Sequence, residues 1–214
     1  MFDIYVEFIR PLIDTKYTAI CEGDDYWCDS NKIRMQYDYM ESNPNCSLCV
    51  HNTEKINEKG RSINRVFNQS KEDVDYSAED VIAKGPAGLF HTSSFFYRTE
   101  LRDRKPDVFL MKHVGDYPLS VFLSCNGHVH YFGRVMSKYR VDSRNSWSKM
   151  INGDSNRLIA HFEDEIQLLI RMDKYTELRY HSQFQALINK DKFEKSVIEV
   201  GLFNSLKCKE NRDT

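Results

Sequence analysis

The sequence lacks any long apolar run and carries almost no net charge. No stretch of its 214 residues approaches the roughly eighteen apolar residues needed to span a bilayer, and the mean hydropathy is −0.60. Thirty basic and thirty-two acidic side chains leave a formal charge of −2, which is too small to attract a polyanion. We therefore expect no nucleic-acid partner and at most peripheral contact with a membrane.

The sequence also lacks a secretory signal and a disulfide framework. The first residues, MFDIYVE, contain neither a basic n-region nor a cleavage site. The six cysteines, at positions 21, 28, 46, 49, 125 and 208, follow no regular spacing. These absences predict free thiols and a cytoplasmic location. A chain of this length can bury roughly 70% of its unfolded surface, so it needs no covalent crosslinks.

Short strand and helix patterns alternate over the first two thirds of the chain, which is typical of an α/β layer architecture. Strands are predicted at residues 17–21, 46–50, 94–98, 128–132 and 134–140. Helices are predicted at residues 2–14, 31–42, 77–85 and 116–126, and Ser77 to Asp80 have the spacing of a capping box. The polar stretch 52–75 has few periodic apolar positions and is predicted to be a loop.

In the helix predicted at residues 31–42, Ile33, Tyr37 and Met40 fall on one face, which we expect to be the packed face.

The pattern changes after residue 147, where helical spacing continues without strand signals. We therefore divide the chain into an α/β part, residues 1–150, and an all-helical C-terminal extension, residues 151–214.

An acidic loop follows the first predicted strand. Residues 22–27 read EGDDYW, and the glycine and carboxylates end the apolar run. Most such clusters are solvated turns. Carboxylates fixed at the end of a buried strand can also hold a hard divalent cation, and that cation can neutralise a diphosphate.

Residues 16–27 resemble the segment of family 2 glycosyltransferases that enters their Asp-x-Asp-Asp motif. Asp29, Lys32, Gln36 and the run 43–49 resemble the helix and strand that follow the motif in that family. Further blocks recur in the family's order at residues 94–98, 115–119, 139–141 and 146–148. Several blocks in order over about 130 residues are far more specific than any single block.

This resemblance implies an incomplete GT-A fold, a Rossmann-like mixed sheet flanked by helices. It also implies an inverting transfer of a sugar from a nucleotide-sugar donor to a hydroxyl of a glycan or lipid-linked acceptor. The family's domain begins with a strand, loop and helix that hold the nucleotide, but only sixteen residues precede Tyr17. We therefore expect this chain alone to be inactive, with an N-terminal segment or second chain missing. The alternative is a non-catalytic remnant that serves as a structural or interaction module.

The resemblance implies a role for particular carboxylates. Asp116 matches the family's general base, although an Asp at a helix start can also act only as a cap. Donor and diphosphate contacts are implied for Glu22, Asp24, Asp25 and Arg140, and Arg140 could equally pair with a structural carboxylate.

A divalent metal, manganese or magnesium, is the cofactor that the resemblance implies. Its expected ligands are Asp24, Asp25 and Asp142. Glu22 departs from the family's usual Asp at the first motif position, and Asp142 stands where many members carry His. The second departure adds a negative charge near the expected diphosphate.

Other candidates have simpler interpretations. Cys46, Cys49 and His51 could form half of a metal site, but buried strand residues are the better interpretation because no second pair is evident. Tyr26 and Trp27 could stack on a sugar or only pack against a strand. His91, at a strand entry, could line an acceptor site.

Overall fold

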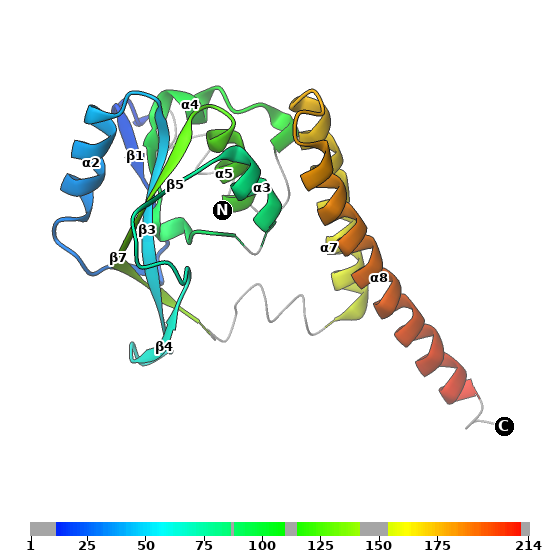
Figure 1. Cartoon of the computed structure of the whole chain (residues 1–214). Helices are drawn as coiled ribbons and strands as arrows, with labels where there is room; N and C mark the ends of the chain where they lie inside the picture. The colour runs from blue at the N-terminus through cyan, green and yellow to red at the C-terminus, as the bar shows by residue number, and fades with distance from the viewer. Residues whose placement is uncertain (1–11, 87, 110–114, 142–153, 211–214) are drawn as a thin grey trace.

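The computed structural model describes residues 12–86, 88–109, 115–141 and 154–210 (Figure 1). Most of the helix predicted at residues 2–14 lies outside these ranges. So do Asp142, the block 146–148 and the boundary set at residue 150.

A curled, mixed, seven-stranded sheet forms the centre of the molecule (Figure 1). Its main path runs β1 (Tyr17–Ala19), β6 (Phe96–Arg98), β3 (Cys46–Ile56), β7 (His128–Arg140) and β2 (Tyr26–Trp27). The short strands β4 (Ser62–Val66) and β5 (Val74–Tyr76) pair with β3 and β7 respectively. Strands β3 and β7 run parallel, and the other pairs are antiparallel. The α/β prediction is thereby confirmed at the level of a mixed sheet with helices.

The prediction of a loop over residues 52–75 is wrong. Strand β3 continues to Ile56, and β4 and β5 follow within the supposed loop. The polar residues Asn52 and Thr53 at its start are buried because each finds a partner. The Asn52 amide nitrogen donates to the Asn68 carbonyl at 2.9 Å, and Thr53 Oγ1 lies 2.9 Å from Ser137 Oγ.

Residues 128–132 and 134–140, predicted as two strands, form the single strand β7. Gly133 lies within this strand. A glycine is required there because a Cβ atom would collide with the Lys71 carbonyl oxygen. The glycine permits a close backbone approach and does not break the strand.

Helix α2 (Lys32–Ser42) forms where predicted but packs through a different face. Ile33 and Tyr37 are 40% and 45% exposed, whereas Lys32, Gln36 and Met40 are buried. Gln36 is buried because its amide nitrogen donates to the carbonyls of Cys49 and Ser94, both at 2.8 Å.

Helices on the other side of the sheet include α3 (Ala78–Lys84), α4 (Thr99–Asp103) and α5 (Asp116–Ser124). The capping box predicted at the start of α3 is confirmed: Ser77 Oγ accepts from the Asp80 amide, and the Asp80 carboxylate accepts from the Ser77 amide. Short 3-10 turns span Thr92–Ser94 and Asp107–Phe109.

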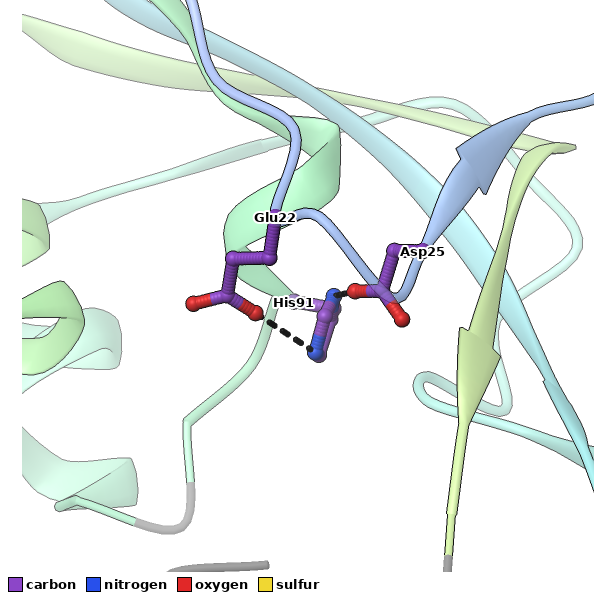
Figure 2. A group of neighbouring side chains, drawn as sticks. All are labelled: Glu22, Asp25 and His91. Carbon is purple, nitrogen blue, oxygen red and sulfur yellow. Dashed lines mark ion pairs between the residues drawn. The ribbon is translucent and has the colours of Figure 1, made fainter. Parts of the chain in front are cut away.

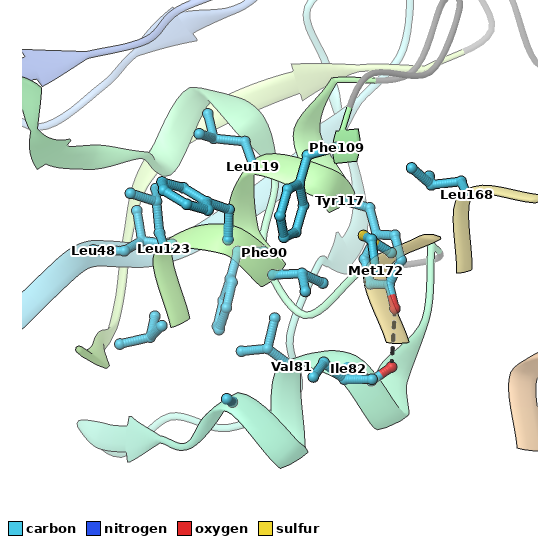
Figure 3. Close-up of a cluster of buried hydrophobic side chains, with 14 of the residues drawn as sticks. Leu48, Val81, Ile82, Phe90, Phe109, Tyr117, Leu119, Leu123, Leu168 and Met172 are labelled. Atoms are coloured by element: carbon cyan, nitrogen blue, oxygen red, sulfur yellow. Dashed lines mark hydrogen bonds between the residues drawn. The ribbon is translucent and has the colours of Figure 1, made fainter. Parts of the chain in front are cut away.

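Two long C-terminal helices, α7 (Ser155–Tyr175) and α8 (His181–Glu210), lie beside this layer (Figure 1). They belong to the main hydrophobic cluster, which joins apolar residues of β3, α3, α5, β7, α7 and α8. Figure 3 shows Leu168 and Met172 of α7 beside Phe109 and Tyr117, and Tyr117 Oη donates to the Ile82 carbonyl at 3.2 Å. None of the helices in the described ranges has the length and apolar character needed to cross a membrane.

Candidate functional site

The acidic loop connects two strands of the sheet. Strand β1 ends at Ala19, β2 begins at Tyr26, and a turn in which the Asp25 amide donates to the Glu22 carbonyl at 3.1 Å closes the loop. Because both ends are hydrogen-bonded into the sheet, the position of the carboxylates between them is fixed.

Asp25 points into the protein and is incompletely satisfied. Its side chain is 0% exposed. Oδ1 accepts from the Arg140 amide at 3.0 Å, but Oδ2 is buried without a hydrogen-bond partner among the described residues. Burial raises the pKa of this carboxyl to about 6, and the neighbouring Asp24 adds to the shift. A buried carboxylate oxygen without a partner costs free energy unless a proton or a cation compensates it.

Glu22 lies at the open side of the same loop. Its side chain is 51% exposed, and Oε2 lies 3.9 Å from His91 Nε2. Desolvation raises the pKa of Glu22 to about 7, with further contributions from the charges of Asp25, Asp116 and Asp24, in that order. The charge of Asp116 thus contributes to the electrostatic environment of Glu22.

His91 joins the two carboxylates, as Figure 2 shows. Nδ1 lies 3.5 Å from Asp25 Oδ2, and the ligand atoms of Glu22, Asp25 and His91 all lie within 4.8 Å of one another. Burial lowers the pKa of His91 to about 4, so the ring is neutral near pH 7. Sequence reasoning assigned His91 only to an acceptor site, because its distance in sequence from the loop gives no metal-ligand spacing.

Neighbouring side chains fix the His91 ring. Its centroid lies 4.1 Å from that of Tyr139, with the planes tilted by 30°, and 5.5 Å from that of Phe67 in an edge-on arrangement. Nδ1 lies 2.9 Å from Ser93 Oγ and accepts from the Ser93 amide at 3.3 Å.

Asp116 is the first residue of α5 and is exposed. The N-cap position belongs to Gly115, and no side chain caps this helix end. Asp116 Oδ1 accepts from the amide of the next residue, Tyr117, at 2.9 Å. Its carboxylate therefore remains accessible at a helix N-terminus.

Arg140 fastens the loop to its surroundings. Its guanidinium donates to the carbonyls of Asp24 at 3.2 Å, Asn57 at 3.1 Å and Glu58 at 2.8 Å. These backbone contacts give Arg140 a positioning role. The side chain of Asp24 is exposed, and Asp142 lies outside the described residues.

The remaining candidates lie in packed surroundings. Cys46, Cys49 and His51 are buried in β3, and burial lowers the pKa of His51 to about 3. Trp27 Nε1 donates to the Ser93 carbonyl at 2.9 Å, and Lys32 Nζ lies 4.4 Å from the centre of the Trp27 ring. Cys46, Cys49 and His51 therefore belong to the core, and Trp27 packs over the buried Lys32 ammonium.

Comparison with known proteins finds a distant similarity to proteins whose names state no function. No family model matches the chain. Uncharacterized proteins of Mycobacterium bovis and Mycobacterium tuberculosis are 28% identical to it over 135 residues, which are 62% of this chain and 36% of each relative. The match thus spans about a third of the length of these curated relatives.

Proposed function

We propose that this chain is part of an inverting GT-A glycosyltransferase that moves a sugar from a nucleotide-sugar donor to a hydroxyl of a glycan or lipid-linked acceptor. One observation carries the proposal: the strand-end loop presents three carboxylates, and one of them, Asp25, is fully buried with an oxygen that has no hydrogen-bond partner among the described residues. Asp116, exposed at the start of α5, is the proposed base.

The acidic loop is the donor side of the proposed site. Its carboxylates Glu22 and Asp25 fit a divalent cation such as manganese or magnesium, because Asp25 Oδ2 is buried and has no hydrogen-bond partner among the described residues. Such a cation would neutralise the donor diphosphate. Arg140 keeps the loop in place through its contact with the Asp24 carbonyl.

Asp116 is the acceptor side. As the acceptor oxygen attacks the anomeric carbon, its proton passes to the Asp116 carboxylate, and the bond between that carbon and the diphosphate oxygen breaks. The electron pair leaves with the nucleoside diphosphate. A positioned base of this kind contributes typically about 10²–10⁴-fold to the rate.

Donor binding provides the first test. Ligand-observed NMR of the purified chain with manganese and a panel of sugar nucleotides should detect binding at roughly millimolar affinity. Asp25→Asn should abolish it, and Asp107→Asn, at an exposed position of the Asp107–Phe109 turn, should leave it unchanged. If none of the donors binds, or if binding does not depend on Asp25, the chain is better explained as a non-catalytic module.

Turnover measurements test the role of Asp116 as the base. They use this chain fused to the N-terminal segment of a family 2 glycosyltransferase. Asp116→Asn should lower turnover by at least about 10²-fold and leave donor affinity nearly unchanged. Asp107→Asn again serves as the matched control. Loss of donor affinity or of thermal stability in Asp116→Asn would instead make Asp116 structural.

A further inference from the structure

We propose that Glu22, Asp25 and His91 form a metal site of mixed oxygen and nitrogen ligands that takes a transition-metal cation of the Mn²⁺, Co²⁺ or Zn²⁺ class in preference to Mg²⁺. The inference deepens the proposed function on its donor side. It assigns a ligand, His91, from outside the acidic loop and leaves Asp24 out of the protein's own ligand set.

Asp25 supplies the strongest reason to expect a cation. Its side chain is fully buried, yet Oδ2 has no hydrogen-bond partner in the described parts of the chain and faces the His91 ring at 3.5 Å. Buried carboxylate oxygens are normally hydrogen-bonded, and each exception requires an explanation. A cation held among the ligand atoms of Glu22, Asp25 and His91, which lie within 4.8 Å of one another, would satisfy this oxygen.

His91 is held as a metal-binding histidine usually is. The Tyr139 and Phe67 rings fix its plane. Behind it, a buried chain of hydroxyls runs from Ser93 to Ser137 and Thr53, with each step 2.9 Å. Ligating histidines commonly use the second ring nitrogen in this way, to bond a group that fixes orientation and tautomer.

The chain of hydroxyls also provides an acceptor for the proton of the His91 ring. Coordination through Nε2 requires the ring proton to be on Nδ1. Ser93 Oγ, 2.9 Å from Nδ1, can accept it, in place of the longer contact from the Ser93 amide. Ser93 Oγ can in turn donate to Ser137 Oγ.

Glu22 makes the site open on one side. Its Oε2 lies 3.9 Å from His91 Nε2, a spacing that a cation with bonds of about 2.1 Å can bridge. Since half of the Glu22 side chain is exposed, coordination positions remain for water or a phosphate oxygen. Three protein ligands with an open position are typical of catalytic metal sites.

The ligand types set the class of cation. Imidazole nitrogen suits transition metals, whereas magnesium takes oxygen ligands and keeps several waters. One imidazole with two carboxylates therefore favours manganese, cobalt or zinc. An all-oxygen loop of Glu22, Asp24 and Asp25 would not discriminate in this way.

Metal binding to the full chain without nucleotide tests the proposal. We expect manganese titration by EPR to show one site, pulsed EPR to detect ¹⁴N coupling from an imidazole, and magnesium to compete at least about tenfold more weakly. Asp25→Asn and His91→Gln should each weaken manganese binding at least about tenfold. His91→Gln should also remove the nitrogen coupling.

Asp24→Asn is the matched control, because it makes the same charge change in the same loop at an exposed side chain. It should weaken binding by less than about threefold, since exposed charges are screened. The proposed ligand set would be overturned if Asp24→Asn and Asp25→Asn lost equal manganese affinity. It would also be overturned if the wild-type protein showed no nitrogen coupling. The wild-type spectrum decides even if a variant fails to fold. Sugar transfer is measured separately. If the metal binds but no sugar is transferred, the proposed glycosyltransferase activity is rejected and the metal site stands.

Discussion

Gln36 lies at the centre of the contact between α2 and the sheet, where helical spacing leads one to expect an apolar side chain. Its amide nitrogen donates to two strand carbonyls, and its Oε1 accepts from the buried Lys32 ammonium at 2.7 Å. The Lys32 ammonium also lies over the Trp27 ring. The polar face of α2 is thus buried through hydrogen bonds, which a pattern of apolar residues does not reveal.

We predict that Gln36→Leu lowers the free energy of unfolding by at least about 2 kcal/mol, because it removes two hydrogen bonds to backbone carbonyls and one from the buried Lys32 ammonium. Urea unfolding measures this change. Arg34→Leu places the same side chain at an exposed position of α2 and should alter stability by no more than about 0.5 kcal/mol. Equal effects from the two changes would show that the hydrogen bonds of Gln36 contribute little.

The candidate site was predictable only where a local motif marks its residues. The EGDD run and Asp116 could each be singled out from a short block of sequence. His91 could not be recognised as a partner of the loop, because only the folded sheet brings it 3.5 Å from Asp25. Arg140 was singled out for phosphate, but its contacts are to backbone carbonyls.

Local signals predicted the elements better than their lengths. The capping box at Ser77 fixed the start of α3 correctly. By contrast, the polar second half of β3 was predicted as loop because its buried Asn52 and Thr53 resemble solvated residues. Long-range pairing with β7 determines that strand, and this pairing leaves no local signal.

The buried carboxyl groups of helices α7 and α8 include Glu165 and Asp191. Burial raises their pKa values to about 7 and about 6, and the charge of Asp191 adds to the shift at Glu165. His161 Nε2 lies 3.3 Å from Glu165 Oε2, while Asp191 Oδ2 has no hydrogen-bond partner in the described ranges. The charged form of Asp191 therefore destabilises the folded state.

The sign of the pH dependence follows from the raised pKa. The folded protein holds the Asp191 proton up to about pH 6, whereas the unfolded chain loses it near pH 4. The destabilisation is thus complete above pH 6 and is relieved as the pH falls towards 4. Asp191→Asn should raise the free energy of unfolding by about 1–2 kcal/mol at pH 8 and by much less at pH 4.5.

Urea midpoints of wild type and Asp191→Asn across this pH range measure the effect. Asp164→Asn, at an exposed position of α7, is the control and should show no comparable difference. A stability gain that is the same at pH 4.5 and pH 8 would contradict the titration of Asp191 as its cause.

At the scale of the molecule, the C-terminal helices share the core of the sheet layer. The apolar residues that α7 and α8 contribute to the main cluster are Ile166, Leu168, Leu169, Met172, Phe184, Leu187 and Ile188. Gly85, at the end of α3, lies so close to Leu187 of α8 that a Cβ atom there would come within 2.7 Å of it. Sequence patterns marked a change of composition near residue 150, but a change of secondary structure does not by itself create a separate core.

We therefore predict that α7 unfolds together with the sheet. Leu169 is 0% exposed, and Leu169→Ala should lower the free energy of unfolding by about 2–5 kcal/mol. Helix content by far-ultraviolet circular dichroism and the fluorescence of Trp27 should shift together, because β2, which carries Trp27, pairs with β7 of the same core. A Trp147→Phe background removes the second tryptophan. Ile170→Ala, one residue further along and 43% exposed, should have a much smaller effect. If helix content melted first and the Trp27 transition stayed at its wild-type midpoint, the helices would be an independent unit.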